Sequence, residues 1–293
     1  MKKDITELFC FVDDFEKMYE ETMRHHQLAQ GGKIKFPTRT PDLTCSEIAT
    51  ILLIFQQSPI RNFKAFYLLL LSPHYKSDFP LLPTYERFIS LIPRTFGLFV
   101  ILLHCLFAKS RGISYIDATS LAVCHNKRIF NHKVFKGLAA RGKTTKGWFF
   151  GFKLHVVINE KAELVRVKLT KGNVDDRVVV PSMTSSLEGL LFGDKGYISE
   201  KLFLALYRRG LKLVTGIKKN MKNKLMILHE KFLLRKRSLI ETVFDYLKNK
   251  FQIEHTRHRS PTNAFVHLLS TLVAYQMKPT KPSFVHSYAL PNP

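Results

Sequence analysis

Cysteine is scarce in this sequence, and its beginning has no apolar segment. The four cysteines, Cys10, Cys45, Cys105 and Cys124, are widely separated and form no CxxC pair, so neither a disulfide framework nor a zinc site is indicated. The first residues, MKKDITELFCFVDDF, lack the apolar core of a signal peptide. The apolar run 96–107 is too short to cross a bilayer. We therefore expect a soluble cytoplasmic protein in a reducing environment, with no membrane partner.

Acidic residues are also few. The chain holds 23 Asp and Glu against 46 Lys and Arg, a formal net charge of +23, which is more than solubility requires and predicts a polyanionic partner. Residues 1–110 carry 13 basic and 11 acidic residues, whereas residues 111–293 carry 33 and 12. Ribosomal and histone-like proteins usually carry their charge on flexible tails. Here the excess lies in the part with enzyme-like motifs, so we expect chemistry and polyanion binding in one domain.

The chain of 293 residues is 45% hydrophobic, enough for one large core or two ordinary ones. Apolar residues recur at helical spacing up to about residue 109, with Pro and Gly breaks between them, which predicts an all-helical domain over 1–110. Thr44 and Ser46 are candidate helix caps. Such a domain could contain a helix-turn-helix that binds DNA, or could serve packing or dimerisation alone.

After Arg111 the pattern changes to short segments rich in β-branched and aromatic residues. These segments predict three consecutive antiparallel strands, at 114–123, 148–158 and 164–170. Further elements then alternate: a helix at 176–187, a strand ending at Phe192, a helix at 199–208 and a strand at 211–217. A mixed α/β layer structure follows from this order. A lysine-rich stretch at 218–224 precedes a long helix at 231–251 and another at 262–276, and the tail from residue 278 is expected to be loose.

Two aspartates occupy strand positions in otherwise apolar surroundings. Asp117 lies within SYIDATSLAV, and Asp194 directly follows GLLF in FGDKGY. A carboxylate there costs desolvation energy unless it is paired, although either aspartate alone could simply bond backbone amides. A third carboxylate, Glu241, lies in the long predicted helix. At about 100° per residue, Arg237, Glu241 and Lys248 form one polar stripe beside an apolar one, so we expect Glu241 to lie next to the sheet.

Three carboxylates from two strands and a helix suit a hard cation such as Mg²⁺, which prefers oxygen ligands and keeps water positions open for phosphates. A pair of such ions could activate the attacking oxygen and stabilise the leaving oxygen of a phosphoryl transfer. Nearby Lys or Arg would neutralise phosphate charge. We therefore predict Asp117, Asp194 and Glu241 as catalytic metal ligands.

The motifs in this region resemble those of bacterial insertion-sequence DDE transposases, closest to the insertion-sequence nine-eighty-two group. They are YIDATS at 115–120, GNVDDR at 172–177, GDKGY at 193–197 and the block from Ile240 through IEHTRHRSPTNAF. Related enzymes carry a Tyr, Arg, Glu, Lys signature, and Arg237, Glu241 and Lys248 match its last three positions. Leu234 stands at the tyrosine position, so Tyr197 or Tyr246 would have to substitute.

The resemblance implies an α/β fold with an RNase H-like mixed sheet flanked by helices, preceded by the all-helical N-terminal domain. The expected domains are 1–110, a catalytic domain at 111–277 and a flexible tail at 278–293. It also implies a DNA transposase that cleaves the ends of its element and transfers a 3′-hydroxyl strand to target DNA. Two Mg²⁺ ions, with Mn²⁺ as a substitute, a homodimer holding two DNA ends and a place at the bacterial nucleoid complete the expectation.

Basic residues near the motifs are candidates for phosphate contact. The predicted DNA-binding residues are Lys143, Lys146, Lys195, Arg237, Lys248, Arg257 and Arg259. The alternative to DNA contact is an ordinary solvated loop, for Lys195, for the run 255–259 and for the residues around Trp148. Core packing is favoured for Trp148, although Arg141 and Lys143 beside it would also suit an unpaired base. Asn173 to Asp176 reads better as a turn with an N-cap than as part of the active site.

Two other functions remain open from the sequence. A nuclease with the same carboxylates would cleave without joining strands. A DNA-binding regulator, or a decayed element product, would keep the basic charge without the chemistry, although the intact carboxylates argue against it.

Overall fold

The computed structural model describes residues 5–29, 41–145, 147–217, 226–255 and 257–283. The predicted lysine-rich stretch 218–224, Lys146 and the last ten residues of the predicted tail therefore lie outside the described residues. The chain forms two compact units. The first contains residues up to Leu106 together with Phe251–Ile253 and His258–Met277, and the second contains Phe107–Lys250, Glu254–Arg257 and the residues from Lys278.

The first unit is helical throughout its secondary structure, as the apolar spacing predicts. Its elements are α1 (Ile5–Ala29), α2 (Cys45–Gln57), α3 (Phe63–Ala65), the π-helical η1 (Phe66–Leu71), α4 (Ser72–His74), α5 (Tyr85–Leu91), the 3₁₀ turn η2 (Ile92–Thr95), α6 (Phe96–Cys105) and α11 (Pro261–Met277). Thr44 begins α2 with a capping box, in which Thr44 Oγ1 accepts from Glu47 N and Glu47 Oε2 accepts from Thr44 N. The expected cap at Thr44 is confirmed, whereas Ser46 donates to Asp13 of α1.

The helical run Tyr85–Cys105 is long and apolar enough to cross a membrane by length and composition. The sequence had suggested a shorter apolar run, because Pro93 marks a break that the structure bridges with η2. The core helix of a soluble protein passes the same test, and Phe88, Phe99 and Leu102 of this run are buried in the first unit. The run therefore gives only weak evidence for a membrane partner.

Helix α11 packs against α2 and α6 in the first unit. This differs from the division expected from the sequence, which placed residues 262–276 at the end of the catalytic domain. The reason is the distribution of apolar residues along α11. Val266, Leu272, Val273, Ala274 and Tyr275 are all buried, and helical periodicity alone does not report which partner covers them.

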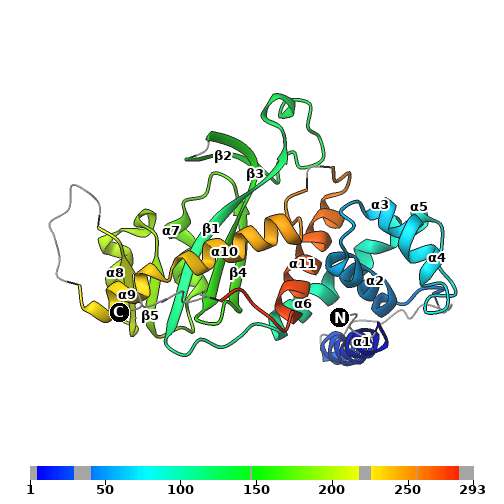
Figure 1. The fold of residues 1–293 in the computed structure, drawn as a ribbon, viewed down its shortest axis with the longest axis horizontal. Helices are drawn as coiled ribbons and strands as arrows, with labels where there is room; N and C mark the ends of the chain where they lie inside the picture. Colours follow the sequence, from blue (N-terminus) through cyan, green and yellow to red (C-terminus); the bar gives the residue numbers. More distant parts are fainter. Residues whose placement is uncertain (1–4, 30–40, 146, 218–225, 256, 284–293) are drawn as a thin grey trace, which may run out of the picture. The chain divides into compact units, whose positions relative to one another are not determined.

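The second unit is built on one mixed sheet (Figure 1). Its strands are β1 (Ile113–Cys124), β2 (Ala140–Thr144), β3 (Gly147–Asn159), β4 (Leu164–Lys171), β5 (Gly189–Gly193) and β6 (Leu211–Thr215). The order β4-β3-β1-β5-β6 forms the body of the sheet, and β2 pairs with the far end of β3. β3 is antiparallel to its neighbours β1 and β4, whereas β1, β5 and β6 are parallel. The expected mixed sheet flanked by helices, preceded by a helical N-terminal region, is confirmed.

The three consecutive strands predicted from the sequence form β1, β3 and β4 within one residue at each end, and the later elements α7 (Asp176–Met183), α8 (Glu200–Tyr207), β5 and β6 also appear. Strand β2 was missed because its sequence, ARGKT, has no apolar alternation. It pairs with β3 with Gly142 opposite Phe149, and a Cβ at Gly142 would meet Gly172 O at 2.2 Å and the Phe149 ring at 2.6 Å.

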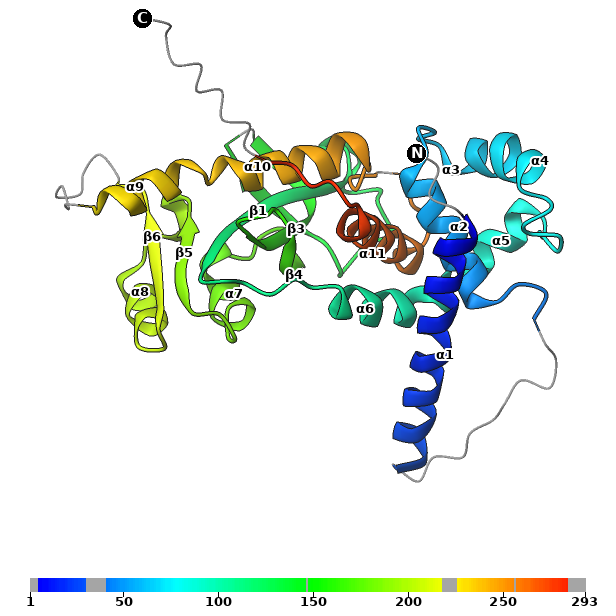
Figure 2. The same ribbon diagram turned by 60° about the horizontal axis from the view of Figure 1, so that its bottom comes forward.

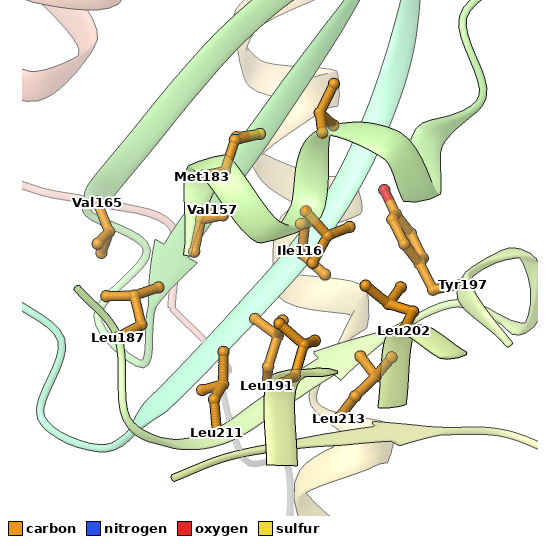
Figure 3. Packing of buried hydrophobic residues seen from close by; sticks show 13 residues of the cluster. Ile116, Val157, Val165, Met183, Leu187, Leu191, Tyr197, Leu202, Leu211 and Leu213 are labelled. Atoms are coloured by element: carbon orange, nitrogen blue, oxygen red, sulfur yellow. The ribbon is translucent and has the colours of Figure 1, made fainter. Parts of the chain in front are cut away.

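Helices cover both faces of the sheet (Figure 2). On one face, α7 and α8 lie over an apolar cluster that includes Ile116, Val157, Leu191 and Leu213 (Figure 3). On the other face lie α9 (Leu228–Arg235) and α10 (Ser238–Asp245), with α9 against β5 and β6 and α10 against β1. Because strand side chains alternate, Tyr115 and Asp117 point to the α10 side while Ile116 points into the cluster.

The long helix predicted at 231–251 is three segments: α9, α10 and a π-helical turn η5 (Tyr246–Lys250). A tight turn at Lys236 and Arg237 separates α9 from α10, with Leu239 N donating to Lys236 O and Ile240 N to Arg237 O. The expected apolar stripe survives the break, since Leu233, Ile240, Phe244, Leu247 and Phe251 are all buried.

Candidate active site

The parallel pairing of β1 and β5 brings the two aspartates to the same level of the sheet. Tyr115 lies opposite Phe192, and their rings are 5.5 Å apart. Two residues further along each chain come Asp117 and Asp194. Asp194 directly follows β5 and precedes a single 3₁₀ turn, η4 (Lys195–Tyr197), and it is exposed there.

Arg237 joins Glu241 to this edge. Its Nη1 donates to Asp117 Oδ2 at 3.3 Å and its Nη2 to Glu241 Oε1 at 2.5 Å. The turn at residues 236–237 places Arg237 immediately before α10, one helical turn ahead of Glu241. The polar stripe predicted from the sequence therefore faces the strand aspartates, and one guanidinium spans two of the three carboxylates.

Asp117 is a costly carboxylate to ionise. Its pKa is raised to about 6. Burial is the main cause, and the negative charges of Asp194 and Glu241 also contribute to the rise. The Ala118 N–H, 2.8 Å from Asp117 Oδ1, and the Arg237 guanidinium both lower it. The charges of Asp194 and Glu241 therefore act on Asp117, and the joint role of the three carboxylates stays a prediction.

These groups have the donor chemistry of a divalent metal site. Carboxylate oxygens are the ligands that Mg²⁺ prefers, and a cation beside Asp117 would offset the cost of its ionisation. Within the described ranges, however, no group of three or more His, Cys, Asp or Glu side chains is already gathered as a metal cage. Arg237 lies between Asp117 and Glu241 instead, so binding a metal there requires its guanidinium to shift.

Tyr197 is the tyrosine beside the carboxylates. It is 2% exposed, and its hydroxyl has no hydrogen-bond partner in the described part of the chain. Burial raises its pKa most, and the charges of Asp117, Asp176 and Asp194 add to this. Tyr246, the other tyrosine considered as a substitute for the missing signature position, lies under the ammonium of Lys278 at 4.7 Å. Tyr197 is therefore the candidate on which the charges of Asp117 and Asp194 act.

A buried polar network on β3 was not foreseen from the sequence. Lys153 Nζ donates to Val174 O and to Asp176 Oδ1, both at 2.9 Å, and thereby ties the start of α7 to the sheet. His155 is fully buried; its Nε2 lies 2.8 Å from Thr170 Oγ1 and its Nδ1 3.9 Å from Asp176 Oδ1. The signal was present, because Lys and His alternate with apolar residues in GFKLHVV.

The GNVDDR motif divides its two aspartates. Asp175 is the N-cap of α7, and its side chain accepts from Arg177 N at 2.9 Å. Hydrogen bonds from Arg177 lower its pKa to about 2. This is the structural role that the sequence favoured for the turn, whereas Asp176 belongs to the Lys153 network.

Lys248, expected to contact DNA, is engaged elsewhere. Its Nζ donates to Ser120 O on β1 at 2.7 Å and pairs with Glu254 Oε2 at 3.1 Å. Glu254 Oε1 in turn accepts from Ala122 N at 3.0 Å, next to the β-bulge of β1. The pair anchors the chain after η5 to the strand that carries Asp117, a role that helical spacing does not reveal.

The other predicted DNA-binding residues remain exposed at several places. Lys195 is exposed beside Asp194, with its aliphatic stem against Gly216. Lys143 is exposed on β2, and Lys146 lies outside the described residues. Arg257 belongs to the second unit and Arg259 to the first, and both are exposed.

Trp148 corrects one expectation. The sequence favoured core packing for it, yet its side chain is 53% exposed. In β3 it pairs with Lys143 of β2, and both side chains are exposed to solvent there. Phe149, its neighbour, points the other way and is buried against Gly142 and Gly172.

Comparison with known proteins places this arrangement in a family. Residues 107–261, more than half of the chain, match the model of the transposase DDE domain. A match among solved structures is the crystal structure of the Mos1 strand transfer complex, at 10% identity and a TM-score of 0.23, over 94% of this chain and 96% of that one. No curated protein matches. The family match covers β1 to the start of α11, and on it the chain belongs to the transposase DDE domain family.

Proposed function

We propose that this protein cleaves the ends of an insertion sequence and joins their 3′-hydroxyls to target DNA, with Asp117, Asp194 and Glu241 as its catalytic carboxylates. The observation that supports the proposal is that Arg237 bonds both Asp117 and Glu241, while the charge of Asp194 also acts on Asp117. The motif resemblance to the insertion-sequence nine-eighty-two group supports a bacterial element as the source of the DNA ends.

The three carboxylates would hold divalent metal ions, with Mg²⁺ as the physiological ion and Mn²⁺ as a substitute. Metal ions bound there supply a deprotonated nucleophile and stabilise the charge on the leaving oxygen. The half-buried Asp117 favours this use, because a carboxylate with a pKa of about 6 gains strongly from a neighbouring cation.

The cationic side chains would handle the phosphate. Arg237 would donate both Nη groups to a pair of phosphate oxygens if it were released from Asp117 and Glu241, because a guanidinium suits that geometry. Lys195, exposed next to Asp194, is the second candidate for the scissile strand. Lys248 would position β1 and not contact the phosphate itself, because its ammonium binds Ser120 O and Glu254.

The remaining partner proposals follow from the reaction. Two element ends must be joined to one target, so a homodimer is the simplest assembly that supplies two sites. Lys143, Lys146, Arg257 and Arg259 would bind flanking DNA, with affinity that falls as salt rises because each phosphate contact releases counterions.

The test uses the full chain and labelled duplexes that carry the terminal repeats, with Mg²⁺, Mn²⁺ or EDTA. We expect metal-dependent nicking at the repeat boundary and joined products, both lost in Asp194→Asn and Glu241→Gln. Asp245→Asn is the matched control, since Asp245 is an exposed acid on the same helix, bonded to Asn249. Cleavage without joining would indicate a nuclease, and salt-sensitive binding without cleavage in any metal would indicate a regulator.

A further inference from the structure

The far end of the β2–β3 ribbon carries an exposed aromatic side chain between two cations. The Arg141 guanidinium lies 5.3 Å and the Lys143 ammonium 5.6 Å from the centre of the Trp148 ring. Arg141 and Lys143 alternate along β2, and Lys143 pairs directly with Trp148, so all three side chains share one face. We call these three residues the Trp148 platform.

The surroundings of the platform are uniformly basic. Residues 125–150 contain no Asp or Glu. Their basic residues are Lys127, Arg128, Lys133, Lys136, Arg141, Lys143 and Lys146. In the described part of the chain, neither Arg141 nor Lys143 forms an ion pair with a carboxylate. The positive charge is therefore available to an outside anion.

A hydrogen bond and the packing of the opposite face hold the platform in place. Asn126 Nδ2 donates to Trp148 O at 2.6 Å, which fastens the segment after β1 to the ribbon. Phe149 packs on the opposite face against Gly142 and Gly172. The indole is thus held half-exposed on a supported strand, where an outside group can reach its ring.

The sheet register places the platform on the catalytic face. Asp117 pairs with Val156 in β3, and the even-numbered residues of β3, from Val156 back to Trp148, alternate onto the same face. The eight residue steps from Val156 to Trp148 span about 26 Å at the rise of a strand. A strand of DNA that passes Asp117 could thus continue along β3 to the platform.

We propose that the Trp148 platform binds an unpaired stretch of DNA, with one nucleobase stacked on the indole and the adjoining phosphates on Arg141 and Lys143. Stacking on an aromatic ring requires a free base face, which single-stranded DNA offers and a duplex buries. The two cations would attract the phosphates of the strand and bring it to the ring. This site deepens the proposed function, since the strand would belong to the DNA being processed, but binding at it does not depend on catalysis.

Trp148 is the only tryptophan, so fluorescence of the full chain reports on this site alone. We would titrate the protein in EDTA with oligo-dT of about twelve nucleotides, with a blunt duplex and with polyphosphate, which has charge but no bases. Oligo-dT is expected to quench the fluorescence strongly, and the duplex and polyphosphate weakly. Equal quenching by all three would overturn stacking and leave phosphate contact alone.

Variants complete the test by anisotropy of dye-labelled oligo-dT. Trp148→Leu should weaken binding roughly ten-fold, the range found for one stacked base, and Trp148→Phe should recover part of it. Tyr207→Leu is the matched control, because Tyr207 is 59% exposed on α8, which covers the opposite face. Unchanged binding in Trp148→Leu, or an equal loss in Tyr207→Leu, would refute the proposal. If the wild-type chain shows no cleavage in the transposition assay but oligo-dT still quenches the Trp148 fluorescence, the proposed function is refuted and the platform is not.

Discussion

His155 should make the stability of the protein fall as the solution becomes mildly acidic. The ring is fully buried in β3, opposite Ala118 of β1, and burial is the main cause that lowers its pKa to about 4. Asp176 raises the pKa, whereas Lys153 and Lys168 lower it. The perturbation is His155→Gln, which removes the titrating ring and keeps an amide that can bond Thr170.

The sign and size follow from proton linkage. The pKa of the imidazole is about 6.5 in the unfolded chain and about 4 in the folded chain. Falling pH therefore favours the unfolded state across that window. Relative to pH 7.5, the His155 contribution at pH 5 amounts to a loss of about 2 kcal/mol, from RT ln of the two binding polynomials.

Urea unfolding followed by circular dichroism at pH 5, 6 and 7.5 measures this loss. Between pH 7.5 and pH 5, the unfolding free energy of the wild type should fall by about 2 kcal/mol more than that of His155→Gln. His229→Gln, at an exposed position on α9, should run parallel to the wild type. Parallel curves for His155→Gln as well would show that the buried ring is not neutral, and would refute the reasoning.

Three further substitutions test the packing described above, each by thermal or urea unfolding. Thr44→Ala removes the capping box of α2 and should lower the unfolding free energy by about 1 kcal/mol; no change would mean that Glu47 N finds another acceptor. Glu254→Ala leaves the Ala122 N–H and Lys248 without their carboxylate and should cost about 1–3 kcal/mol, with Glu254→Gln milder because it keeps an acceptor. Tyr197→Phe deletes a buried hydroxyl that has no partner in the described chain, so the free energy should stay level or rise by about 1 kcal/mol; a large loss would reveal a hydrogen bond.

The elements with strong local signals could be predicted from the sequence. β1, β3 and β4 are rich in β-branched and aromatic residues, and the structure places them within a residue of the predicted bounds. Asp117 and Asp194 were recognisable because a carboxylate next to an apolar strand is expensive. The position of Glu241 near Asp117 was also expected, since Arg237, four residues before Glu241, bonds both carboxylates.

The rest depended on contacts between distant residues. Lys248 has the right spacing for a phosphate ligand, but Ser120 and Glu254 hold it, and their proximity arises only from the tertiary fold. The break before α10 has no Pro or Gly to signal it. Trp148 was expected inside because tryptophan usually is largely buried, yet it pairs with Lys143 at the end of the sheet and is 53% exposed.

The placement of α11 has a consequence for the order in which the chain can fold. Helices α2 and α6 are made early by the ribosome, whereas α11, which packs against both, follows the entire catalytic sheet. The first unit therefore cannot complete its core until synthesis is nearly finished, and its apolar faces need protection until then. A product that stops before residue 261 should be recognised by proteases as incomplete, so a truncated message from a damaged copy of the gene would not yield a stable helical fragment able to compete for DNA.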